Sequence, residues 1–96
     1  MAATATCTTL YSFREDRRRL YRRVRVDITG LAPGANTIAH GITKRESSAQ
    51  GAVPIEEVPV PTSAVVAHRT QAADSTNLYY TVDSGSGTTM SVFVTV

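Results

Sequence analysis

The sequence predicts a single small all-β domain over residues 1–96, an antiparallel sandwich or partly open barrel of about six or seven strands. Apolar and polar residues alternate in residues 20–28, and again in residues 77–84 and 90–96. β-Branched residues, Thr and Ser dominate the composition, and Gly and Pro recur between the alternating segments. Because successive residues of a strand point to opposite faces, these patterns indicate strands that are buried on one side.

Residues 20–28 form the most regular of the predicted strands. One face carries Val24, Val26 and Ile28, and the other face is a ladder of arginines with one tyrosine. β-Branched residues this close together favour a strand over a helix. A turn rich in Gly and Pro follows, and after it we expect a second, short strand over residues 37–42.

The N-terminal part is predicted to form a hairpin with the arginine-bearing strand. Residues 9–13 alternate, and the polar run 14–18 supplies the turn. The alternative is a short helix over residues 13–19, because its start has the spacing of a capping box. Arg17 interrupts the apolar stripe of such a helix, which favours the hairpin. Residues 1–8 are a candidate extended N-terminal arm.

The middle of the chain has weaker signals. Residues 44–51 are polar and predict a loop. Residues 53–61 contain three prolines, which lack the N–H group that a central strand needs, so this segment is predicted to be an edge strand or an extended connection. A short strand is expected over residues 63–70, and a turn over residues 71–75.

The last two alternating segments predict a C-terminal hairpin. Leu78, Tyr80 and Val82 form the apolar face of residues 77–84, and residues 90–96 alternate in the same way. A Gly-Ser-Gly sequence lies between the two segments, and two strands separated by a short glycine-containing turn are typical of a hairpin.

Arginine is concentrated in residues 14–25, which carry seven arginines and two acids in a chain with a net charge of +2. This asymmetry predicts a basic patch on a mildly acidic body. The candidate partner-binding residues are Arg17, Arg18, Arg19, Tyr21, Arg22, Arg23 and Arg25.

Three interpretations of this cluster remain open. Guanidinium groups suit bidentate contacts with carboxylates, which favours an acidic protein partner or another copy of this chain. Nucleic acid is the second interpretation, although no RNA-binding aromatic motif surrounds the arginines. The third is a solvated sheet face on which the arginines pair with Asp16, Asp27 and other acids.

No group of residues in the sequence predicts catalysis. His40 and His68 are the only histidines, and His40 is expected to be a structural residue that bonds to the backbone. Glu56 and Glu57 are adjacent, so on a strand they point to opposite faces and cannot act as an acid–base pair. Cys7 is the single cysteine and is expected to be a buried or half-buried thiol. We therefore expect a protein that is not an enzyme and binds no cofactor or metal.

The N-terminal segment lacks the basic flank and long apolar run of a signal peptide, and no stretch has the length of a transmembrane helix. A soluble protein made in the cytoplasm, with no membrane partner, is expected. A chain of 96 residues buries only a thin core, so an oligomer would add stability.

Both ends of the chain resemble small structural proteins of tailed bacteriophages. The resemblance lies in the start MAATAT…TTLY, the charged turn with its alternating strand, the sequence ITGLAPGANTIAHGI, and the ending DSTNLYYTVDSGSGTTMSVFVTV. It covers about two-thirds of the chain. Residues 44–61 depart from the pattern, because the usual leucine after His-Gly and the compact strand that follows it are missing.

The resemblance implies a virion structural protein, first of all a capsid decoration (cement) protein. Such proteins sit on the shell as trimers and brace neighbouring subunits, so the implied partners are the major capsid protein or another virion protein. The implied location is the virion. A tail or head–tail component is the alternative within the virion, and a nucleic-acid-binding module that uses residues 17–25 is the alternative outside this class.

Overall fold

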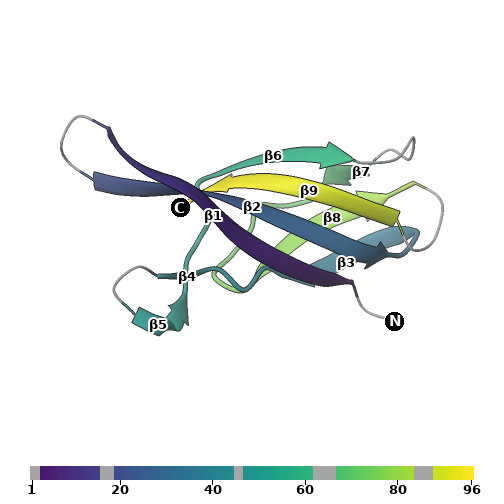
Figure 1. The fold of residues 1–96 in the computed structure, drawn as a ribbon. Helices are drawn as coiled ribbons and strands as arrows, with labels where there is room; N and C mark the ends of the chain where they lie inside the picture. Colours follow the sequence, from purple (N-terminus) through teal and green to yellow (C-terminus); the bar gives the residue numbers. More distant parts are fainter. Residues whose placement is uncertain (1–2, 16–18, 45–46, 62–66, 84–87) are drawn as a thin grey trace.

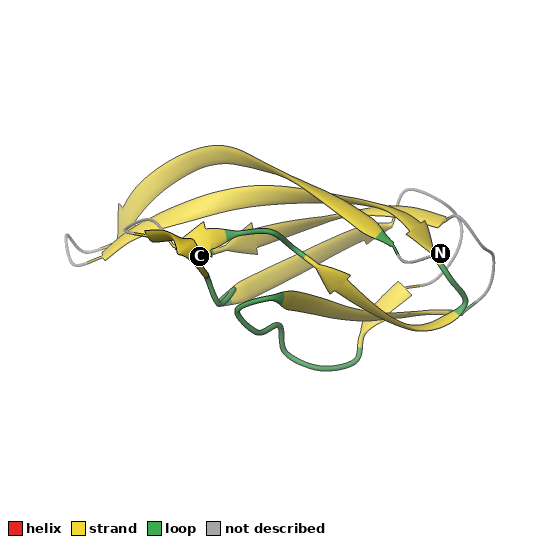
Figure 2. Cartoon of the chain, turned by 90° about the horizontal axis from the view of Figure 1, so that it is seen from below, coloured by secondary structure: helices red, strands yellow, loops and turns green. Residues whose placement is uncertain are grey.

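The computed structural model describes residues 3–15, 19–44, 47–61, 67–83 and 88–96. Within these residues the chain forms nine antiparallel strands in three sheets and no helix, which confirms the all-β class (Figures 1 and 2). The two larger sheets are separate, as in a small sandwich. The described residues form no helix that is long and apolar enough to cross a membrane.

The largest sheet has four strands in the order β1-β2-β9-β6. Its strands are β1 (Thr4–Glu15), β2 (Arg19–Leu31), β9 (Thr88–Thr95) and β6 (Glu56–Pro61). The second sheet has the order β3-β8-β7, with β3 (Gly34–Ala39), β8 (Asn77–Val82) and β7 (Ala67–Arg69). A small ribbon joins β4 (Thr43–Lys44) to β5 (Ser47–Gly51).

The core lies between the two larger sheets and follows the predicted alternation. Every second residue is buried over residues 24–28 of β2, 78–82 of β8 and 90–94 of β9, and these residues form one apolar cluster with Ile38 of β3. The cluster includes Val24, Val26, Ile28, Leu78, Tyr80, Val82, Met90, Val92 and Val94. Full burial of an aliphatic side chain contributes roughly 1.5–3 kcal/mol, so this cluster is the main source of stability.

The N-terminal hairpin is confirmed. β1 and β2 are antiparallel neighbours from Thr4↔Thr29 to Glu15↔Arg19, so the helix alternative for residues 13–19 is wrong. The hairpin extends beyond the other strands at one end of the molecule (Figure 1). Residues 4–8, part of the candidate arm, belong to β1 and pair with β2.

The predicted C-terminal hairpin is wrong. β8 pairs with β3 and β7, whereas β9 pairs with β2 and β6, so the two strands lie in different sheets. The Gly-Ser-Gly turn lies outside the described residues. The alternation correctly identified which side chains are buried. It carries no information about whether two buried faces lie side by side in one sheet or opposite each other in two sheets.

Four smaller predictions can be compared with the structure. Residues 44–51 were expected to be a loop, but β5 pairs with β4 there, and with the other short strands this raises the described total to nine. The second strand ends at Ala39, before residue 42. β6 is an edge strand, as its prolines predict. Of the expected strand at 63–70, Ala67–Arg69 is β7, and 63–66 are not described.

A buried carboxylate joins the two sheets at the β6 edge. The Glu57 side chain is only 2% exposed and faces the inner side of β6. Its oxygens accept hydrogen bonds from the Tyr80 hydroxyl at 2.9 Å and from the Arg69 guanidinium at 3.1 Å. Burial, followed by the charge of Glu57, raises the pKa of Tyr80, so the hydroxyl remains protonated and continues to donate.

We predict that Glu57→Ala lowers the free energy of unfolding by about 3 kcal/mol, because removal of one member of a buried ionic network leaves its partners uncompensated. Urea unfolding measures the effect. Glu56→Ala is the matched control: its side chain is 61% exposed and its ion pair lies at the surface, so a loss under about 1 kcal/mol is expected. Equal losses of stability in the two variants would contradict the stabilising role of the buried Glu57 contacts.

Candidate functional site

The side of the four-stranded sheet that points away from the core is the candidate site, and we call it the outer face. The residues that alternate with the buried ones lie together on this side of the sheet, as the strand registers show. The outer face comprises Thr6, Thr8, Tyr11, Phe13, Tyr21, Arg23, Arg25, Asp27, Glu56, Val58, Val60, Ser91, Phe93 and Thr95.

Three aromatic rings form a continuous row on the outer face. Tyr11 and Phe13 lie two residues apart on β1, with ring centroids 6.0 Å apart. Phe13 is paired with Tyr21 of β2, and their rings stack with centroids 5.5 Å apart at an interplanar angle of 26°. The Tyr11 side of the row is open to solvent, since that residue is 56% exposed. Aromatic rows of this kind supply rigid apolar contact area at low cost in side-chain entropy.

An open groove runs beside the row. It has a volume of about 310 Å³ and is lined by Phe13, Tyr21, Ile55, Glu56 and Thr95. Ile55 is 55% exposed, and the apolar surface continues along β6 through exposed valines. Exposed large apolar residues are ordinary when scattered, but a contiguous set on one rigid face is typical of an interaction surface.

The charged groups on the outer face neutralise one another. Arg23 donates to Glu56 at 2.6 Å and to the Thr95 hydroxyl at 2.6 Å. Arg25 lies 3.1 Å from Asp27 along the same strand. Two arginines and two carboxylates therefore give this face no net charge among the described side chains. Exposed pairs of this kind contribute at most about 1 kcal/mol each, so they orient the side chains more than they stabilise the fold.

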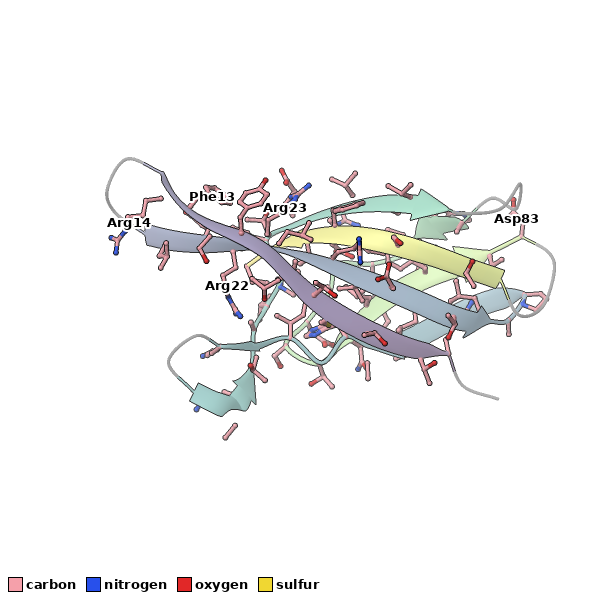
Figure 3. The ribbon with its side chains drawn as sticks, viewed as in Figure 1. Phe13, Arg14, Arg22, Arg23 and Asp83 are labelled. Carbon is pink, nitrogen blue, oxygen red and sulfur yellow. The ribbon has the colours of Figure 1, made fainter. Side chains whose placement is uncertain are left out.

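Arg22 points to the opposite side of β2 from Arg23 (Figure 3). Its guanidinium donates to the main-chain carbonyl of Thr43 and so ties the β4–β5 ribbon to the hairpin. This difference follows from the strand period, because neighbouring residues cannot share a face. Arg22 is therefore a structural contact rather than part of the outer face.

The predicted basic patch is thus divided by the structure. Tyr21, Arg23 and Arg25 lie together on the outer face, and Arg22 does not. Arg17 and Arg18 lie outside the described residues, and Arg19 is the first residue of β2. Of the interpretations drawn from the sequence, pairing of arginine with neighbouring acids is observed at Asp27.

Sequence reasoning missed the apolar part of the site. Tyr11 and Phe13 share a face because they alternate on β1, and this signal was present in the sequence. Val58 and Val60 also alternate, but the prolines between and beside them obscured the pattern. That these two strands flank the arginine strand and β9 in one sheet could not be read from local spacing.

His40 is a structural residue, as predicted. It is 1% exposed, and its Nδ1 accepts from the Ile42 N–H at 2.9 Å, so the ring donates through Nε2 to the carbonyl oxygen of Asp74 at 2.9 Å. Both ring nitrogens are therefore committed to the backbone. In the part of the chain that is described, no three His, Cys, Asp or Glu side chains are grouped to hold a metal ion.

Cys7 is exposed as a residue, but its thiol lies on the inner side of β1 and donates to the main-chain carbonyl of His40. Burial of the sulfur, followed by the charge of Asp27, raises the pKa of the thiol. A thiol that remains protonated is a poor nucleophile.

Comparison with protein-family models, with curated proteins and with solved structures finds no match to this chain. The outer face must therefore be interpreted from its own geometry.

The Asp74 carboxylate organises the turn before β8. One oxygen accepts from the N–H groups of Thr76 and Asn77 at 2.8 and 2.6 Å, and the other accepts from the Tyr79 hydroxyl. The hydroxyl of Tyr79 first, and then the two amides, lower the pKa of Asp74. These bonds favour the ionised carboxylate in the folded state.

We predict that Asp74→Asn makes stability less dependent on pH in the acid range. Because the folded pKa is lowered, the contribution of Asp74 is complete above its unfolded value of about pH 4 and is lost as pH falls through the folded value. Urea unfolding at a series of pH values should show the wild-type stability converging on that of the variant in acid. A constant difference at every pH would contradict this role.

Proposed function

We propose that this chain is a non-catalytic binding protein that attaches to another protein through the outer face. The observation that supports this most directly is the exposed aromatic row beside the groove on a rigid, hydrogen-bonded sheet. Tyr, Phe and Arg are enriched in the centres of protein interfaces, whereas unpaired charge is depleted there. The outer face has this composition.

The resemblance to small phage structural proteins gives this proposal a context. We propose that the chain is a structural subunit of a virion, and a capsid decoration protein in the first instance. Its action would be adhesive: many copies contact a repeating shell, and weak contacts that are made together multiply into strong attachment. The partner would be the major capsid protein or another virion protein.

A neutral outer face favours a protein over nucleic acid as the partner. Binding to nucleic acid depends chiefly on cations that neutralise phosphates. Arg23 and Arg25 already lie against carboxylates, and Arg22 is held by a main-chain carbonyl. A partner that displaced these contacts would have to compensate for them, whereas a protein surface can cover the aromatic row and leave the ion pairs in place.

We predict that the double variant Tyr11→Ser, Phe13→Ser loses attachment to virion particles prepared without this chain. Truncation of central aromatic residues costs about 2 kcal/mol or more, so the Kd should rise at least roughly 30-fold in co-sedimentation. Tyr79→Ser is the matched control, because it removes an aromatic ring from β8 of the other sheet. Wild-type protein that does not sediment with capsids or tails would refute the virion proposal.

The salt dependence of attachment separates the two classes of partner. Binding through a neutral, largely apolar face should change less than tenfold between about 50 and 200 mM salt. Duplex DNA held by three arginine–phosphate contacts would lose roughly 40-fold over the same range, because each phosphate contributes a slope of about −0.9. Steep loss, together with a DNA shift at low salt, would replace the protein-binding proposal with the nucleic-acid one.

A further inference from the structure

β1 is an edge strand: β2 pairs with one side of it, and no described strand pairs with the other side. It is 12 residues long and lies at the margin of the four-stranded sheet (Figure 1). An edge of this length presents a row of N–H and C=O groups that can pair with a further strand. Folded proteins usually protect such edges with proline, lysine or a very short strand.

The opposite edge of the same sheet carries this protection, whereas β1 has only one irregularity, a bulge at the register shift between Thr9 and Tyr11. β6 has only six residues, and Pro59 and Pro61 remove donors from it. Within Thr4–Glu15 there is no proline and no lysine, and the charged residues, Arg14 and Glu15, stand together at the hairpin end. The β6 edge is thus closed to strand addition, and the β1 edge is open over residues 4–9, on the N-terminal side of its bulge.

The direction of the free backbone groups follows from the register. Arg22 of β2 exchanges two hydrogen bonds with Val96, at 2.8 and 3.0 Å, so the main-chain groups of even-numbered β2 residues point toward β9. Residues of β1 opposite these, such as Ala5 beside Ile28 and Cys7 beside Val26, therefore point their own groups away from β2. These groups are the ones that a new strand would meet.

We propose that this edge pairs with the β1 edge of a second copy of this chain, antiparallel across a two-fold axis. When a strand pairs antiparallel with the same strand of a second copy, backbone donors meet backbone acceptors, and the interface is isologous. The side chains permit it: residues 4–9 are alanine, cysteine and threonines, with no charge to repel its own copy. Threonine pairs across antiparallel strands are favourable.

A two-fold axis near Cys7 fits the edge best. This register places Thr6 opposite Thr8 of the second copy and Ala5 opposite Thr9, so the regular pairing ends before the bulge at Leu10. Arg14 and Glu15 then lie beyond the paired segment, so neither faces a like charge. The two four-stranded sheets would form one continuous sheet, with both outer faces on the same side of the pair. This inference depends on the edge alone, and the dimer it proposes differs from the trimer that the resemblance implies for a decoration protein.

Charge substitutions on the full chain test the pairing. Light scattering should give twice the 10.3 kDa chain mass for the wild type. The variant Thr6→Lys, Thr8→Lys and the variant Thr6→Glu, Thr8→Glu should each give the monomer mass, because like charges oppose each other across the axis. An equimolar mixture of the two variants should recover the dimer mass, since opposite charges then meet.

Within one chain, the attraction and repulsion that each variant adds to β2 offset each other. Thr6 is paired with Asp27 and Thr8 with Arg25, so each variant gains one attractive and one repulsive neighbour on β2. Thermal melts should therefore show both folded. The control Ala35→Lys, Thr37→Lys places the same charges on β3 of the other sheet and should remain dimeric. A monomeric wild type, a trimer, or a dimer that survives the Thr6 and Thr8 lysines would overturn the proposal.

Discussion

The contact between the aliphatic faces of β2 and β9 and the inner face of β8 is the constraint on which the rest of the structure depends. Val26, Val92 and Leu78 are fully buried in it. Because side chains alternate along a strand, burial of these residues turns their neighbours outward. The outer face is therefore a direct consequence of the core: a register slip of one residue on β2 would place arginines among the valines.

Polar groups inside the sandwich are placed so that none is left without a partner. Among the described residues, every buried side-chain nitrogen or oxygen atom has a hydrogen-bond partner. Glu57 connects β6 to Tyr80, and His40 connects the end of β3 to the turn before β8. An unpaired buried polar group costs roughly 1–3 kcal/mol, so these bonds favour this arrangement of the two sheets over alternatives with a similar apolar core.

The chemistry of the outer face differs from what its charge density suggested. A run of arginines indicates attraction to an anion, yet the described arginines of this face contact Glu56, Asp27 and hydroxyl groups. With these charges paired, the aromatic row and the groove beside it are the features of this face on which the proposed binding depends. A face of this kind suits recognition by shape and apolar area, and on this ground we propose a structural role in an assembly in which many copies act together.

The two sheet edges add a second level of organisation. Proline closes the β6 edge without weakening the sheet, because its missing N–H would point to solvent. The β1 edge lacks such a device over most of its length. We propose that the outer face contacts a partner and that the β1 edge contacts a second copy of the chain. In this protein the two surfaces lie on the same sheet.

The sequence by itself determined the all-β class and the buried residues of β2, β8 and β9. It favoured the N-terminal hairpin over a helix, and it limited β6 to an edge strand or an extended connection. Each of these follows from local physics: the strand period of two, and the missing N–H of proline. Only the tertiary structure decided that β8 and β9 belong to different sheets, that Arg22 contacts the β4–β5 ribbon, and that Glu56 neutralises Arg23. These depend on which strands become neighbours, and alternation is identical for a neighbour in the same sheet and for one in the opposite sheet.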